Sequence, residues 1–127
     1  MADGSTSPKT DSPDHFELVE MARGLTATVL ARAHDAEQNR RLHRETHEAL
    51  LQGGFYKVQM PARYGGLEMS HRTMLDCAVE IGRGCGSSAW IFSNIAAQNG
   101  IVSMASRAAQ DDVWAANSDA CTASSFP

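Results

Sequence analysis

Apolar residues recur along the chain at the spacing of amphipathic helices, and polar or glycine-rich stretches separate them. In the first stretch the apolar side chains follow one another at three- and four-residue steps: Leu18, Met21, Leu25 and Val29. This spacing places them on one side of a helix. Because Ser12 can cap that helix and Pro13 suits its first turn, the pattern predicts a helix from about residue 13 to about residue 35.

The same kind of pattern predicts four further helices. Residues 39–52 carry one apolar face and end at a pair of glycines. Ser70 stands where it can cap a third helix, which stops in a glycine-rich run. A fourth helix covers about residues 89–104, and a fifth, capped by Ser106, extends to about residue 116.

The fourth predicted helix is apolar on most of its circumference, which is typical of a helix buried among others. Between the second and third helices, Pro61 predicts an extended or irregular stretch, because the residue before a proline avoids helical geometry. Near the end of the chain, residues 119–126 have the apolar alternation of a strand whose partner strand is not present.

These elements predict an all-α fold of five helices. We expect a disordered lead-in at 1–12, a helical domain at 13–117 and the first residues of a truncated β-domain at 118–127.

Charge and composition narrow the classes of function. Eleven Lys and Arg residues stand against 15 Asp and Glu residues, which gives a net charge of −4. Nucleic-acid binding needs a clustered basic surface, and the one tight basic group, Arg40, Arg41 and Arg44, is interpreted as a solvated helix face. The composition therefore predicts no nucleic-acid partner.

Membrane insertion and metal binding are not indicated either. The start of the chain lacks a secretory signal, and polar residues interrupt the longest apolar region, 88–105. The three cysteines are odd in number and lack the spacing of a zinc site, which favours a reducing, cytoplasmic location. His43 and His47 are four residues apart but have no third ligand nearby, so we predict no metal site.

One polar set on the fourth predicted helix could contact a ligand. Trp90, Asn94 and Gln98 recur at four-residue steps and so share a face. The two amides need hydrogen-bond partners on an otherwise apolar helix. Those partners are either groups of a neighbouring helix or buried water, or a ligand that the amides orient in an apolar pocket.

Four stretches, in the order in which they occur, resemble the N-terminal helical domain of the acyl-CoA dehydrogenase superfamily. They are Arg40-Arg-Leu42, Glu48-Ala-Leu-Leu-Gln-Gly-Gly-Phe55, Met60-Pro-Ala-Arg-Tyr-Gly-Gly-Leu-Glu68 and Glu80-Ile-Gly-Arg-Gly-Cys-Gly-Ser-Ser-Ala-Trp90. The resemblance covers about residues 14–127. Such a subunit is about three times as long as this chain.

Within that superfamily, the Gly-Ser-Ser-Ala-Trp90 run and the closing Thr122-Ala-Ser-Ser-Phe-Pro127 are most similar to the flavin-dependent monooxygenase branch. The resemblance implies a parent enzyme that hydroxylates an aromatic or other hydrophobic substrate with O2 and reduced flavin, FMN or FAD, from a separate reductase. It also implies a homotetramer at full length. The alternatives are an acyl-CoA dehydrogenase and a cofactor-free helical interaction module.

The resemblance also assigns roles to particular residues. It implies that Trp90, Asn94 and Gln98 line the substrate pocket, and that Ser124 and Ser125 contact the flavin. The alternative role of Ser124 and Ser125 is turn formation. Hydroxylases of this branch often carry a histidine where Gln98 stands, and glutamine cannot act as a base. No catalytic residue is therefore assigned, and we expect the fragment alone to be inactive and to hold flavin incompletely.

Overall fold

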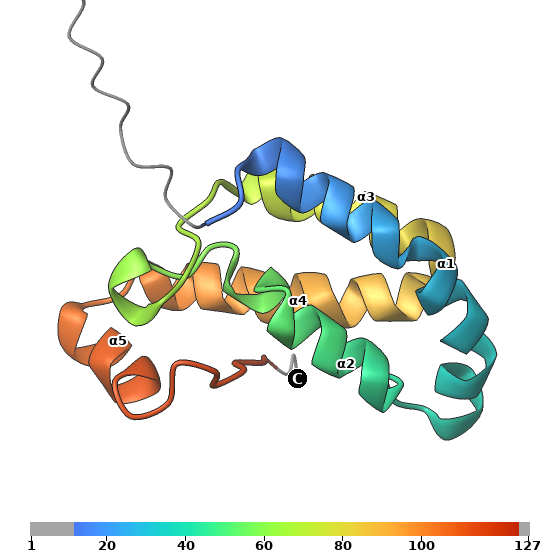
Figure 1. The fold of residues 1–127 in the computed structure, drawn as a ribbon. Coiled ribbons are helices and arrows are strands. Elements are labelled where there is room, and N and C mark those ends of the chain that lie inside the picture. The colour runs from blue at the N-terminus through green and yellow to red at the C-terminus, as the bar shows by residue number, and fades with distance from the viewer. Residues whose placement is uncertain (1–11, 125–127) are drawn as a thin grey trace, which may run out of the picture.

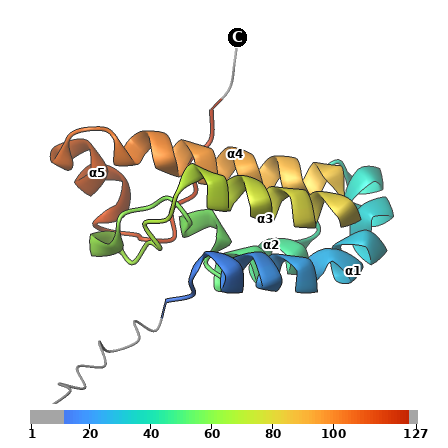
Figure 2. The same cartoon turned by 90° about the horizontal axis from the view of Figure 1, so that it is seen from above.

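A computed structural model describes residues 12–124, and five α-helices and two short 3-10 helices make up its regular structure. The elements are α1 (His15–Asn39), α2 (Arg44–Gln52), η1 (Phe55–Lys57), η2 (Ala62–Tyr64), α3 (His71–Gly84), α4 (Gly86–Ser103) and α5 (Arg107–Trp114). The long helices α1, α3 and α4 run side by side, with α3 in contact with both others (Figures 1 and 2). The prediction of an all-α fold with five helices is confirmed.

Helix α1 begins and ends later than predicted. Its cap is Asp14 and not Ser12: Asp14 Oδ1 accepts from the backbone N–H of Glu17 at 2.9 Å, and Glu17 Oε2 accepts from the backbone N–H of Asp14 at 2.9 Å. This reciprocal cap satisfies two N–H groups that the helix leaves free. At the other end the helix continues to Asn39, where Arg40 takes a left-handed conformation with φ of 50°.

The buried side of α1 also differs from the predicted stripe. Its fully covered residues are Leu18, Ala22, Val29 and Ala36, whereas Met21 is 43% exposed. Helix α1 is covered on this side by α3, where Gly84 lies directly against the backbone of Thr26. Side-chain periodicity in one helix cannot show which flank a neighbouring helix covers.

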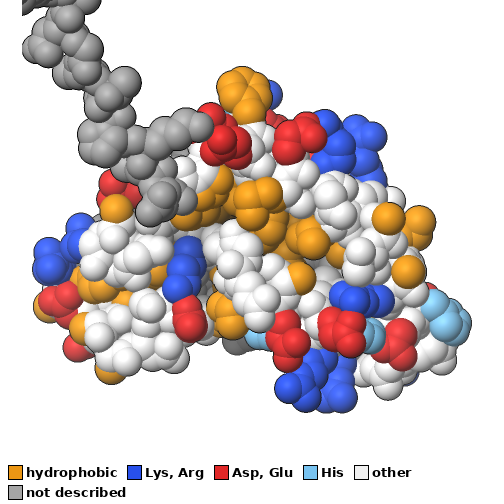
Figure 3. Space-filling view, viewed as in Figure 1, with side chains coloured by type: hydrophobic (Ala, Val, Ile, Leu, Met, Phe, Trp, Pro, Cys, Tyr) orange, Lys and Arg blue, Asp and Glu red, His pale blue; other side chains and the backbone are white. Residues whose placement is uncertain are grey.

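Helix α2 is shorter than predicted because residues 40–43 form a turn instead of its first residues. His43 caps the helix through Nδ1, which accepts from the backbone N–H of Glu45 at 3.3 Å. Ion pairs Arg32–Glu45 and Arg44–Glu48 follow, at 2.5 and 2.8 Å. In Figure 3 the charged side chains over α2 accordingly alternate between basic and acidic.

The stretch predicted to be extended or irregular contains η1 and η2. It folds back on itself: the backbone N–H of Leu67 donates to the Lys57 carbonyl at 2.9 Å, and that of Met69 donates to the Val58 carbonyl at 2.7 Å. These bonds give the backbone polar groups partners without a neighbouring strand. The stretch therefore forms a compact unit, and η1 packs on α4.

The Tyr64-Gly65-Gly66 turn has a structural role. The Tyr64 ring lies 5.2 Å from that of Trp114, and its hydroxyl donates to Asp111. Hydrogen bonds from Tyr64 and then from Arg107 hold the pKa of Asp111 below its ordinary value. The turn thereby anchors α5.

Helix α4 starts at Gly86, earlier than predicted, with Cys85 as its cap. Its apolar composition suggested a central position, but the structure does not place it there. Phe92 and Ala96 are fully buried, but Trp90 is 69% and Ile101 is 54% exposed. The prediction of a helix buried on all sides is therefore wrong for the described residues, because other elements cover α4 on one side.

The strand expected at 119–126 is not formed in its described part, residues 119–124. A strand needs a neighbouring strand to complete its hydrogen bonds, and residues 12–124 supply none. The remaining residues of that expected strand, and residues 1–11 of the expected disordered lead-in at 1–12, lie outside the described residues. Among the described helices, none combines the length and the apolar character that a membrane span requires.

Candidate functional site

The outer face of α4 carries the three residues that the sequence singled out. Trp90 is exposed, and Asn94 and Gln98 are half-buried. Eight residues of helix separate the first from the last, which corresponds to about 12 Å. These side chains therefore form a row along the helix and do not converge on a single point.

The structure brings Gln98 together with Ser124, 26 residues further along the chain. Gln98 Nε2 donates to Ser124 Oγ at 2.8 Å, and Ser124 is exposed. Within residues 12–124, the serine hydroxyl proton has no acceptor and Gln98 Oε1 accepts no hydrogen bond. The candidate substrate and flavin residues thus adjoin each other, while Ser125 lies outside the described residues.

Sequence reasoning missed Asn99, which stands next to Gln98 but points into the protein. It is 2% exposed and uses both ends of its amide. Its Nδ2 donates to the Tyr56 carbonyl at 2.8 Å, and its Oδ1 accepts from Thr122 Oγ1 at 2.7 Å. The sequence signal that could have identified Asn99 is its place seven residues after Phe92. This spacing puts a polar side chain on the buried face of α4.

A second contact holds the start of the same segment. Lys57 Nζ and Asp119 Oδ1 lie 2.5 Å apart, and the Lys57 side chain is 18% exposed. The backbone N–H of Asp119 also donates to Asn117 Oδ1 at 3.0 Å, which tightens the turn before it. Residues 119–124 are therefore attached to η1 and α4 at several points.

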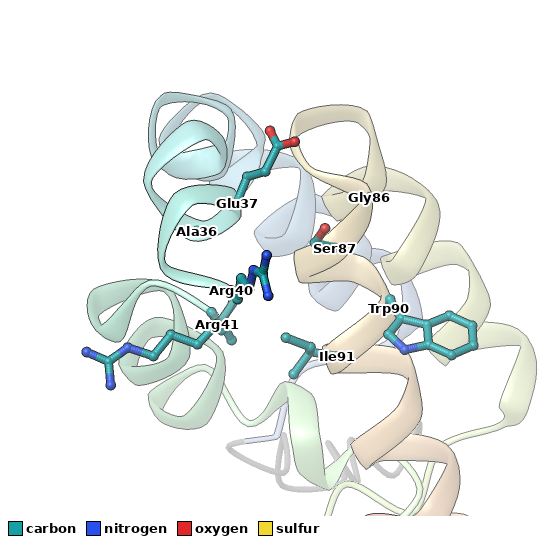
Figure 4. Close-up of a pocket in the computed structure, with 9 residues that line it drawn as sticks. Ala36, Glu37, Arg40, Arg41, Gly86, Ser87, Trp90 and Ile91 are labelled. Carbon is teal, nitrogen blue, oxygen red and sulfur yellow. The ribbon is translucent and has the colours of Figure 1, made fainter. Parts of the chain in front are cut away.

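Trp90 belongs to a different part of the surface. It borders a pocket of about 480 Å³ between the end of α1 and the start of α4, together with Arg40 and Ile91. Figure 4 shows Ile91 pointing toward this space and Trp90 projecting from the opposite side of α4. Neither Asn94 nor Gln98 lines this pocket.

The two histidines at helical spacing point to separate partners. His43 Nε2 lies 3.6 Å from Asp35 Oδ2, and His47 Nδ1 lies 2.9 Å from the Tyr56 hydroxyl. Burial raises the pKa of that hydroxyl well above its ordinary value. Residues 12–124 contain no group of three or more His, Cys, Asp or Glu side chains arranged to hold a metal ion.

The three cysteines differ in accessibility, which allows a direct chemical test of the fold. Cys77 and Cys85 are buried, and burial raises the pKa of the Cys77 thiol to about 12, whereas Cys121 is exposed. We expect a thiol-specific reagent at pH 8 to modify one thiol in the folded protein and three in denaturant. Rapid modification of two or three thiols without denaturant would contradict this arrangement.

Comparison with known proteins places this architecture among flavoenzymes. Residues 12–116 match the family model described as "Acyl-CoA dehydrogenase, N-terminal domain". The oxygenase component of p-hydroxyphenylacetate 3-hydroxylase from Acinetobacter baumannii is 30% identical over 121 residues, covering 95% of this chain and 29% of that protein. The oxygenase subunit HsaA of a flavin-dependent monooxygenase from Rhodococcus jostii is 30% identical over 102 residues, covering 80% and 27%.

Solved structures agree with the sequence relatives. The 3-HSA hydroxylase from Rhodococcus sp. RHA1 superposes with a TM-score of 0.78 at 30% identity, covering 84% of this chain and 28% of that one. XiaF from Streptomyces sp., in complex with FADH2 and glycerol, gives 0.78 at 30% identity, with coverage of 84% and 27%. The chain thus spans less than a third of the length of each of these proteins.

Proposed function

The chain belongs to the acyl-CoA dehydrogenase family through its N-terminal domain, and from that membership we propose that it forms the N-terminal helical part of a flavin-dependent monooxygenase. This parent enzyme hydroxylates an aromatic or other hydrophobic substrate. The relatives named above are hydroxylases or oxygenase subunits, and they share 30% identity with this chain. The observation that carries the proposal is the contact between Gln98 and Ser124 on the outer face of α4.

The chemistry of this pair fits one edge of a flavin. The Ser124 hydroxyl accepts from Gln98 and can donate its own proton, while Gln98 Oε1 can accept. A flavin ring presents both acceptors and an N–H donor along its polar edge. When bound, reduced FMN or FAD would supply the electrons that activate O2.

The other candidate residues on α4 would bind and orient the substrate. We propose that Asn94 and Trp90 contact the substrate, Trp90 with its large exposed ring. Ser125 is a second proposed flavin contact. Since Gln98 has no titratable proton, the described residues on this face do not include a general base. The parent enzyme would take that function from elsewhere or not require it.

The partners and setting of the parent enzyme follow from the same relationship. The term "oxygenase component" in the names of two relatives, one of them FADH2-dependent, supports a separate reductase as the source of reduced flavin. A homotetramer and a cytoplasmic location are the further expectations from the family.

Gln98→Ala in the parent enzyme is expected to lower kcat/KM for hydroxylation by about fivefold, because a positioned hydrogen bond is worth roughly 1 kcal/mol. Product formation with NADH, O2 and added reductase measures it. Ser93→Ala is the control on the same helix, since the Ser93 hydroxyl donates to the Trp90 carbonyl within α4. Unchanged kinetics for Gln98→Ala would argue against the site.

The parent reaction itself has a direct test. Consumption of NADH and O2 with formation of a hydroxylated aromatic product supports the proposal. Bleaching of bound FAD by an acyl-CoA, without need of a reductase, would instead indicate a dehydrogenase.

A further inference from the structure

We infer that Asn99 is a positioning residue that sets the register of residues 119–124 against α4, so that the side chain of Ser124 meets Gln98. The functional meaning of this register rests on the proposed function, because it concerns the serine expected to contact flavin. The register itself is a property of the chain alone.

Asn99 is suited to this role because its partners fix its orientation. The Tyr56 carbonyl can only accept, so it requires the Nδ2 end of the amide, at 2.8 Å. That choice turns Oδ1 toward Thr122, whose hydroxyl donates to it at 2.7 Å. With 2% exposure, water does not compete for these bonds at Asn99.

Thr122 and Ser124 are two residues apart, and in an extended chain successive side chains point to opposite sides. The structure has this alternation of contacts: Thr122 bonds to Asn99 and Ser124 bonds to Gln98, both on α4, and the intervening Ala123 is exposed. A slip of one residue would bring Ala123 to Gln98 and turn both hydroxyl groups outward. The hydroxyl at position 122 thus selects which residue reaches Gln98.

The other contacts of the segment cannot set the register equally well. Lys57 and Asp119 form an ion pair in which the Asp119 side chain is 57% exposed, and pairs of this kind contribute little. The bond between Gln98 and Ser124 is exposed to solvent, so water competes with it. The bond between Asn99 and Thr122 is part-buried, and its loss leaves Oδ1 of Asn99, a side chain only 2% exposed, without this partner.

Cys121 provides a reporter inside the segment. Its thiol is exposed, whereas Cys77 and Cys85 are buried, so a nitroxide spin label attaches selectively at Cys121 in the folded chain. The ratio of mobile to immobile components in the spin-label spectrum measures how often the segment leaves its place.

Two variants remove the bond from opposite sides. Asn99→Leu keeps a side chain of similar size on α4 but removes both hydrogen bonds, and Thr122→Val removes the hydroxyl without altering the core. We expect each to raise the mobile-to-immobile ratio about fivefold, because both remove the one hydrogen bond that joins Asn99 to Thr122 in the segment. Thr122→Ser restores the hydroxyl and should return the ratio to its original value, and Ser93→Ala should leave it unchanged.

The outcomes separate this inference from the proposed function. An unchanged spectrum for Thr122→Val overturns the inference, even if Asn99→Leu fails to fold. In the parent enzyme we expect Thr122→Val to divert about half or more of the consumed O2 to hydrogen peroxide, measured against hydroxylated product. A mobile segment with unchanged product yield would support the register and contradict the flavin role of Ser124. An unchanged spectrum with reduced product yield would leave the proposed function in place and overturn the register.

Discussion

Gly84→Ala is expected to lower the free energy of unfolding by about 3 kcal/mol, the upper part of the range for overpacking a tight interface. A Cβ at this position would lie 2.4 Å from the Thr26 carbonyl oxygen and 3.1 Å from the Leu30 backbone nitrogen. Both atoms belong to the backbone of α1, so no side-chain rotation relieves the contact. Relief requires α1 and α3 to separate, which also breaks the 2.9 Å bond from Thr26 Oγ1 to the Glu80 carbonyl.

Gly24→Ala is the matched control for this change. Gly24 lies inside α1, and a Cβ there would meet nothing within 4 Å. Alanine favours a helix interior over glycine, so this variant should gain about 0.5–1 kcal/mol. Urea unfolding followed by circular dichroism measures both variants. Equal effects of the two substitutions would show that helix propensity, and not the close approach of α1 to α3, decides the outcome at Gly84.

Phe92→Ala is expected to lower the free energy of unfolding by about 3–5 kcal/mol, because it leaves a cavity in the core as well as losing buried apolar surface. Phe92 is fully buried on the inner face of α4. Its ring meets that of Phe55 edge to face, with centroids 6.1 Å apart and an interplanar angle of 88°. Small domains have stabilities of about 5–15 kcal/mol, so this one change removes a large share.

Phe16→Ala serves as the control for Phe92→Ala. Phe16 is 77% exposed on α1, so its removal should change stability by no more than about 0.5 kcal/mol. The same urea titration compares the two variants. A loss below about 1 kcal/mol for Phe92→Ala would contradict the placement of this ring in the core.

Much of the fold could be predicted because it depends on neighbouring residues. The number of helices and the caps at Ser70 and Ser106 were predicted correctly, since a cap and the turn that it satisfies lie within three residues of each other. The family relationship was equally accessible, because the motifs that carry it are short and continuous. Helix ends were less accurate where a competing cap, such as Asp14 in place of Ser12, lay two residues away.

The site could be predicted only in part. Trp90, Asn94 and Gln98 were assigned to one face of a helix, and in the structure Trp90 is exposed on α4 while Asn94 and Gln98 are half-buried. Spacing along the helix could not show whether the three side chains reach the same pocket. In the structure, Trp90 lines a pocket that includes neither Asn94 nor Gln98. The roles of these residues toward substrate and flavin stay predictions.

Local pattern in the sequence was enough to specify the number of helices, two of their caps and the family, because each depends on residues within a few positions of one another. Three features arise from contacts between distant segments instead. These are the exposure of one face of α4, the fit of Gly84 against Thr26, and the meeting of Gln98 with Ser124. The last depends on Asn99, a polar residue that an apolar helix buries because the Tyr56 carbonyl and the Thr122 hydroxyl satisfy it. Those partners lie 43 and 23 residues away along the chain, and folding alone brings them together.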